Sequence, residues 1–157
     1  MLKSKIQFVD NKPYININED LYSPLAYTTY FDECGEWPDF IKSGYKMFFV
    51  NVSFTDLPIN NTSGFTPFRT GVFESETPDY SEFDEIVSGI ISECPDAFIF
   101  PRINIAMPRK WLQENPYETV TTENGPRESL YSDLFMSDGA ELLKILLTHI
   151  RSADYAD

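Results

Sequence analysis

The chain has 157 residues, which suits one domain with its own core but not a complete eight-stranded (β/α) barrel of roughly 200 to 250 residues. Twelve Lys and Arg stand against 25 Asp and Glu, a formal net charge of −13. Nucleic acids and anionic membranes need a basic surface on their partner, so we expect neither as a partner of this chain.

No run of residues approaches the roughly 18 apolar positions of a membrane helix, and no apolar segment follows the charged N-terminus as in a signal peptide. A cytoplasmic location is therefore expected. Cys34 and Cys94 have neither a CxxC partner nor a His at metal spacing, which favours free thiols over a disulfide or a metal site. His149 lies among leucines, and we expect it to be structural or on the surface. We expect no metal and no cofactor.

The first 50 or so residues contain turn signals between apolar segments. Residues 5–18 alternate polar and apolar side chains around Asp10-Asn11-Lys12-Pro13, which predicts a β-hairpin. Residues 24–31 are rich in β-formers and predict a strand, and residues 37–43 predict a short helix that Gly44 ends. Residues 45–54 are nearly all apolar, as in a strand buried on both faces of a parallel sheet.

The rest of the chain continues the alternation of strands and helices. We expect a loop over 55–78, a helix over 81–94, a strand over 98–107, a loop over 117–135 and a helix over 139–152 that begins with an Asp138–Glu141 capping box. Alternation of this kind predicts an α/β fold with a parallel sheet.

The strand predicted over 98–107 carries two polar side chains late in an apolar run. Alternation places Phe98, Phe100, Arg102 and Asn104 on one face, and Ile99, Ile103 and Ile105 on the other. Barrels of the (β/α) type present ligand-binding groups at the C-terminal ends of their strands. Arg102 and Asn104 are therefore candidate ligand contacts.

Four segments in this order resemble the glycosidases of the family 42 β-galactosidase type and their relatives. They are Tyr27–Glu33, Phe40–Asn51, Tyr80–Asp84 and the junction Ala106–Glu118, which has the pattern A-x-P-x-x-W-L-x-x-x-P. The resemblance implies the first three βα units of a TIM-type barrel, preceded by a small N-terminal hairpin. It divides the chain into a hairpin over 1–20 and a partial barrel over 21–157 that ends before the expected fourth strand.

Retaining glycosidases use two carboxylates about 5 to 5.5 Å apart. The resemblance implies that the acid/base lies just past the fourth barrel strand and the nucleophile on a later strand, so neither catalytic residue is expected in this chain. The intact protein would cleave a β-galactoside-like glycan with retention, and the chain alone would be inactive.

The candidate carbohydrate-binding residues are Asp32, Glu33, Arg102, Asn104 and Trp111. Each has a structural alternative. Arg102 could pair with Asp32 or Glu33 inside the sheet, and Trp111, beside Leu112 at a helix start, could belong to the core.

Two other functions stay open beside the glycosidase fragment. One is a non-catalytic α/β domain that binds carbohydrate or protein, and the other is a subunit that completes a barrel with a partner chain. A partial barrel would leave open strand edges, so we also expect possible self-association through them.

Overall fold

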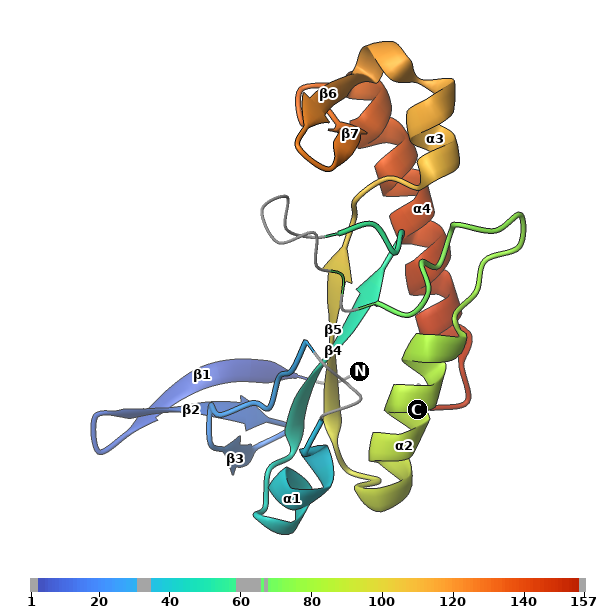
Figure 1. The fold of residues 1–157 in the computed structure, drawn as a ribbon. Coiled ribbons are helices and arrows are strands. Elements are labelled where there is room, and N and C mark those ends of the chain that lie inside the picture. The colour runs from blue at the N-terminus through green and yellow to red at the C-terminus, as the bar shows by residue number, and fades with distance from the viewer. Residues whose placement is uncertain (1–2, 31–34, 59–65, 67, 156–157) are drawn as a thin grey trace.

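The computed structural model of the chain describes residues 3–30, 35–58, 66 and 68–155. Three small sheets and four α-helices make up the described part (Figure 1). The elements are β1 (Ser4–Val9), β2 (Lys12–Ile17), β3 (Asp20–Tyr22), α1 (Trp37–Lys42), β4 (Met47–Ser53), α2 (Ser81–Glu93), β5 (Phe98–Asn104), α3 (Arg109–Glu114), the 3₁₀ helix η2 (Pro116–Glu118), β6 (Thr119–Thr122), β7 (Gly125–Glu128) and α4 (Asp133–Ser152). Among these residues no helix is both long and apolar enough to cross a membrane.

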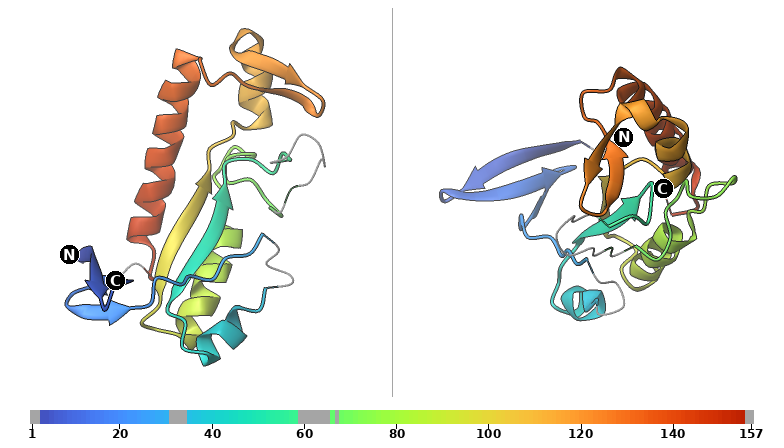
Figure 2. Two further views of the ribbon diagram at one scale, coloured as in Figure 1. Left: turned by 90° about the vertical axis from the view of Figure 1, so that its left-hand side faces the viewer. Right: turned by 45° about the horizontal axis from the view of Figure 1, so that its top comes forward.

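An antiparallel sheet of β1, β2 and β3 extends from the rest of the molecule, and we call it the N-terminal arm (Figures 1 and 2). The predicted hairpin is confirmed: β1 and β2 pair from Ser4–Ile17 to Val9–Lys12. Its turn residues Asp10 and Asn11 have φ of 50° and 61°, the left-handed region that tight hairpin turns require. A second turn adds β3, which the sequence did not predict.

The centre of the molecule is a parallel pair, β4 and β5, joined by a connection that contains α2. The register runs from Met47–Phe98 to Ser53–Asn104. Tyr27 adds one parallel bridge to Phe48 on the far side of β4. In Figure 1 the helices α2 and α4 both lie on one side of this pair, and the N-terminal arm lies on the other.

The main core lies between the parallel pair and the two long helices. Every second residue of β4 and its extension is buried there: Phe48, Val50, Val52 and Phe54. They pack against α2 and α4 residues at helical spacing, namely Phe83, Val87, Ile90 and Leu146. Full burial of such side chains contributes about 1.5 to 3 kcal/mol each, so this cluster holds the helices on the sheet.

Helix α4 begins six residues earlier than the sequence predicted. The hydroxyl of Ser132 accepts a hydrogen bond from the Phe135 N–H at 3.0 Å and so provides the N-cap. Gly139, expected near the start, lies inside the helix against the ring of Phe135. The predicted capping box at Asp138 is wrong because Ser132 gives the first turn an equivalent acceptor sooner.

The predicted fold, three βα units of a TIM-type barrel, is wrong. The parallel sheet has two paired strands, and the expected first strand over 24–31 contributes a single bridge at Tyr27. Residues 119–128, expected to be a loop, form the antiparallel hairpin β6–β7 instead. Between β5 and α4 the chain thus forms a small separate unit of α3, β6 and β7, and α4 then packs against the core. The result is a small α/β fold with mixed sheets.

Candidate functional site

The face of the parallel pair opposite the helices has a mixed aromatic and polar surface. It carries every second residue of β4 and β5, and Figure 2 (left) views the pair from this side. With Tyr30 from the preceding segment, the surface consists of Tyr30, Phe49, Asn51, Ser53, Phe100, Arg102 and Asn104, and we call it the open face. The alternation expected for β5 is confirmed, since Ile99 and Ile103 pack against the core while Arg102 lies on the opposite side.

The middle of the open face is an aromatic pair. Phe49 and Phe100 are direct neighbours in the register, and their ring centroids lie 5.3 Å apart at 33°. Phe49 remains 39% exposed, although it lies in the central strand of the molecule. At the lower end of the same face, Tyr22 from the N-terminal arm contacts Phe98 edge-on at 5.0 Å. The arm thus covers the beginning of β5 and leaves the Phe49–Phe100 pair accessible.

Arg102 lies next to this aromatic pair and is exposed. Its guanidinium carbon is 4.4 Å from the centroid of the Tyr30 ring, and its Nη2 donates a hydrogen bond to the Tyr30 hydroxyl. These two contacts hold the guanidinium over the Tyr30 ring, and no acidic side chain of the described residues forms an ion pair with it. Arg102 is the only charged residue in β4 and β5.

The upper end of the open face is polar and internally hydrogen-bonded. Asn104 Nδ2 donates to Ser53 Oγ at 3.1 Å across the two strands, and Asn51 Nδ2 donates to the Thr29 carbonyl. Asn51 and Ser53 are buried and Asn104 is half-buried. Buried polar groups normally have such partners, so these bonds fix the amide groups in place.

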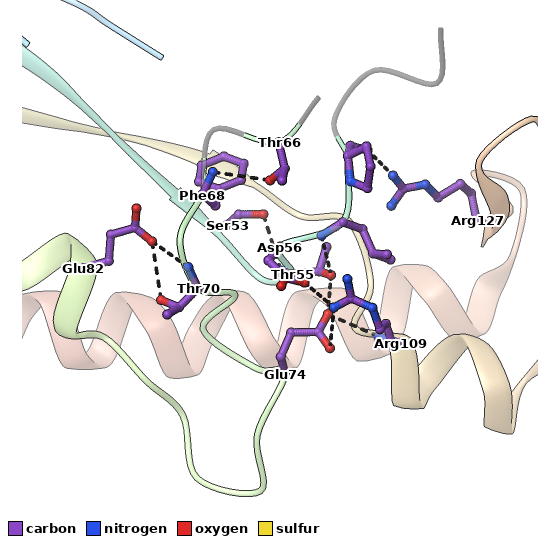
Figure 3. A network of polar contacts seen from close by, with 12 residues as sticks. Ser53, Thr55, Asp56, Thr66, Phe68, Thr70, Glu74, Glu82, Arg109 and Arg127 are labelled. Carbon is purple, nitrogen blue, oxygen red and sulfur yellow. Dashed lines mark hydrogen bonds and ion pairs between the residues drawn. The ribbon is translucent and has the colours of Figure 1, made fainter. Parts of the chain in front are cut away.

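Beyond the carboxyl end of β4, a polar network joins three segments of the chain (Figure 3). Arg109 Nη1 contacts the Asp56 carboxylate and lies 3.3 Å from Glu74 Oε2. Glu74 Oε1 accepts hydrogen bonds from the Thr55 hydroxyl and from the Arg109 backbone N–H. The hydrogen bond to Asp56, followed by the nearby charges of Asp56 and Glu74, raises the pKa of Arg109.

The same network ties the returning loop to α2. Glu82 accepts hydrogen bonds from the backbone N–H groups of Arg69, at 3.1 Å, and of Thr70, at 2.9 Å (Figure 3). Arg127 donates to the Pro58 carbonyl and so joins β7 to the end of β4. Arg109 pairs with both carboxylates nearest the end of β4, those of Asp56 and Glu74. This pairing indicates that the network has a structural role.

The structure brings together two of the five predicted site residues. Arg102 and Asn104 lie side by side on the open face. Trp111 lies instead on α3, where it packs against a second cluster of Met107, Leu112 and Phe135. Its Nε1 donates to Asp138 Oδ2 of α4 at 2.7 Å. Asp32 and Glu33 lie outside the described residues.

Sequence reasoning did not single out Tyr30, Phe49 and Phe100 as site residues. Phe100 was correctly placed on the face of Arg102, but without a role. Phe49 lies in the apolar run Met47–Val50, but the polar residues Asn51 and Ser53 follow it at every second position of β4. This alternation is the sequence signal that puts Phe49 on the polar face, and the register agrees, since Phe49 pairs with Phe100.

A cavity of about 160 Å³ lies at the opposite, N-terminal end of β4. It is lined by Tyr22, Ser23, Leu25, Ser43, Gly44, Tyr45, Lys46 and Met47. Lys46 is already bound to Asp96 at 2.5 Å and lies 3.4 Å from the thiol of Cys94, a free buried cysteine whose pKa burial raises. This cavity is therefore separate from the open face and lacks an available charged group.

Among the described residues, no group of three or more His, Cys, Asp or Glu side chains could hold a metal ion. Comparison of the chain with protein-family models, with curated proteins and with solved structures finds no match. The resemblance to β-galactosidases therefore rests on the sequence motifs alone.

Proposed function

We propose that this chain is a non-catalytic domain that binds a carbohydrate on its open face. The observation that carries the proposal is the exposure of Phe49, beside Phe100, on a parallel strand pair. Parallel sheets are normally covered on both faces. Here the described residues cover one face with helices and leave aromatic rings accessible on the other, which is typical of a surface that binds something.

The chemistry of the open face suits a sugar. Aromatic faces are large, rigid apolar surfaces on which the C–H face of a pyranose ring can stack. Arg102 beside them offers several N–H donors for hydroxyl or carboxyl oxygens. Binding sites commonly combine an apolar surface with a few fixed polar groups. Here the half-buried Asn104 is such a group, and the buried Ser53 holds it in place through a hydrogen bond.

Kinship with β-galactosidases and a cytoplasmic location stay predictions. The motifs suggest a β-galactosidase-like protein, and a cytoplasmic location accords with the free thiol of Cys94. The strands of the open face carry no Asp or Glu, so we place sugar binding on this chain and no hydrolytic step. Purified chain is expected to release no nitrophenol from nitrophenyl β-galactoside above the buffer rate.

The test is titration calorimetry of the chain with β-1,4-linked galactotetraose, cellotetraose and tetragalacturonate. We expect measurable binding of at least one, weakened at least tenfold by Phe49→Ala or Phe100→Ala. The matched control is Tyr117→Ala, because Tyr117 is 98% exposed and lies in η2, outside the open face. If none of the three binds, or if Phe49→Ala and Phe100→Ala leave affinity unchanged while remaining folded, the proposal is wrong.

A further inference from the structure

We infer that the bound saccharide is acidic, with a carboxylate that Arg102 recognises beside the aromatic pair. This inference rests on the proposed function and adds the class of sugar. A uronic acid unit, which carries its carboxylate at C6 of a pyranose ring, has the required chemistry.

Arg102 differs from Arg69 and Arg109 in its partners, because those two arginines form ion pairs with acidic side chains. Arg109 pairs with Asp56 and Glu74, and Arg69 pairs with Glu82 and Glu85. Within the described part of the chain, the contacts of Arg102 are with a phenol ring and its hydroxyl. In a chain with about two acids for each base, an exposed arginine of this kind offers its charge to a ligand.

The geometry matches a carboxylate better than a neutral hydroxyl. The guanidinium carbon lies 4.4 Å from the centroid of the Tyr30 ring, and the Tyr30 hydroxyl engages one of the five N–H donors of Arg102. A planar guanidinium can bind both oxygens of a carboxylate at once, and such charge-assisted bonds are roughly twice as strong as neutral ones.

The spacing along β5 supports the same ligand. Phe100 and Arg102 lie two residues apart on one face, which corresponds to about 7 Å along a strand. A pyranose ring stacked on the Phe49–Phe100 pair can therefore direct its C6 carboxylate toward Arg102. β4 and β5 contain no acidic residue that would repel this carboxylate.

The experiment compares trigalacturonate with its fully methyl-esterified form, two ligands with the same rings that differ in charge. We expect the wild-type chain in 150 mM salt to bind the acid at least tenfold more tightly than the ester. Arg102→Gln should reduce this preference below threefold, because it weakens binding of the acid more than binding of the ester, and Arg102→Lys should keep part of the preference. Arg151→Gln, an exposed arginine in the last turn of α4, is the matched control and should keep the full preference.

The outcomes separate the two proposals. Equal binding of acid and ester by the wild-type chain overturns the acidic ligand and leaves carbohydrate binding intact, as does binding of galactotetraose or cellotetraose alone. An acid preference that persists in folded Arg102→Gln overturns the role of Arg102. Binding of no saccharide at all overturns both. The wild-type comparison needs no variant, so misfolding of Arg102→Gln cannot obscure the main result.

Discussion

Gly71 lies within the connection between β4 and β5, where the chain comes back to the end of β4. The N–H groups of Val72 and Phe73 donate to the carbonyls of Ser53 and Phe54, each at 2.9 Å, so the two backbones run close together. A Cβ at position 71 would lie 2.6 Å from both the Thr55 carbonyl carbon and the Asp56 nitrogen. These neighbours are backbone atoms, which cannot rotate away, and glycine is therefore required here.

We expect Gly71→Ala to lower the free energy of unfolding by about 2 to 3 kcal/mol, because the new methyl group overpacks a fixed backbone contact. The matched control is Gly89→Ala in α2, where a Cβ would make an ordinary 3.5 Å contact with the Trp37 ring. Alanine is the better helix former, so this variant should gain up to about 1 kcal/mol. Urea denaturation followed by circular dichroism measures the free energy of unfolding of both variants. A Gly71→Ala variant as stable as the wild-type chain would show that the neighbouring backbone can shift.

Trp111 can be tested for both of its predicted roles. Trp111→Phe keeps an aromatic ring in the second cluster but loses the hydrogen bond to the Asp138 carboxylate. We expect a loss of about 1 to 2 kcal/mol in the free energy of unfolding and an unchanged affinity for oligosaccharide. Calorimetric titration of the variant decides the matter: a clear loss of affinity would make Trp111 a ligand contact after all.

At the scale of elements, a polar cluster joins α4 to α2. Asp84 of α2 accepts a hydrogen bond from the Tyr155 hydroxyl at 2.6 Å, and its two oxygens lie 3.0 and 2.9 Å from His149 Nε2. Carboxylate oxygens only accept, so Nε2 carries the proton. The ring of Tyr80 stacks on His149 with 3.7 Å between centroids. This arrangement agrees with the structural role expected for His149.

Burial, followed by the hydrogen bond to Asp84, raises the pKa of Tyr155. The folded chain therefore holds this proton more tightly than the unfolded chain, in which tyrosine has a pKa of about 10. The stabilisation is complete below about pH 10 and is lost as the pH rises above it. We expect the free energy of unfolding to fall between pH 9 and pH 11, and to fall less in Tyr155→Phe.

At pH 7 the same variant should be about 1 kcal/mol less stable, because it lacks the hydrogen bond. Urea titrations at several pH values supply the comparison. Burial also raises the pKa of Tyr80. Tyr80 is present in both proteins, so its effect on the pH dependence of unfolding cancels when the wild-type chain is compared with Tyr155→Phe. Parallel pH curves for the wild-type chain and Tyr155→Phe would mean that Tyr155 does not titrate differently on folding.

Elements whose side chains alternate between core and solvent could be predicted from the sequence. The apolar positions of α2 recur at helical spacing, and in the second half of β5 the polar residues Arg102 and Asn104 alternate with Ile103, so the pattern alone places them. Residues 24–31 have strong β-former composition, yet they pair only at Tyr27, because composition does not specify a partner. The β6–β7 hairpin had a readable signal, the Asn124-Gly125 pair, and Gly125 indeed has a φ of 98°.

The candidate site could likewise be predicted only where its residues alternate along a single strand. The positions of Arg102 and Asn104 follow from alternation within one strand and need no knowledge of the neighbouring strand. The partner of Arg102 could not be predicted, because Tyr30 lies 72 residues away in the sequence. The exposure of Phe49 depends on which face of β4 the helices cover, and that is decided only by tertiary packing.

At the scale of the whole molecule, the N-terminal arm differs in charge from the rest. Within residues 3–22 three lysines, Lys3, Lys5 and Lys12, balance three acids, Asp10, Glu19 and Asp20, so the arm has no net charge, although the chain as a whole carries −13. Its β1 strand is an edge of the sheet, and Ile6 and Phe8 on it are 71% and 70% exposed. An open edge with exposed apolar side chains is a site where chains can associate.

Self-association stays a prediction, and the structure suggests the N-terminal arm in place of a barrel edge. Acidic bodies repel at low salt, where charges act over about 30 Å at 0.01 M, but only over about 8 Å at 0.15 M. Sedimentation velocity should show monomer at 10 mM salt and more dimer as salt rises. Combining Ile6→Ser with Phe8→Ser should abolish the dimer, whereas the control pair Tyr117→Ser and Leu130→Ser should not. Dimer that weakens with added salt would argue against this arm.

The long connection between β4 and β5 has a consequence for synthesis of the chain. Met47 pairs with Phe98, 51 residues later, so β4 has no partner strand until that much more chain has been made. At about 5 to 20 residues per second, the delay on the ribosome is roughly 3 to 10 s. Hairpins such as β1–β2 close within about 10 μs of emerging. The nascent chain thus exposes its most apolar strand for seconds, and β4 is where a chaperone would be expected to bind it first.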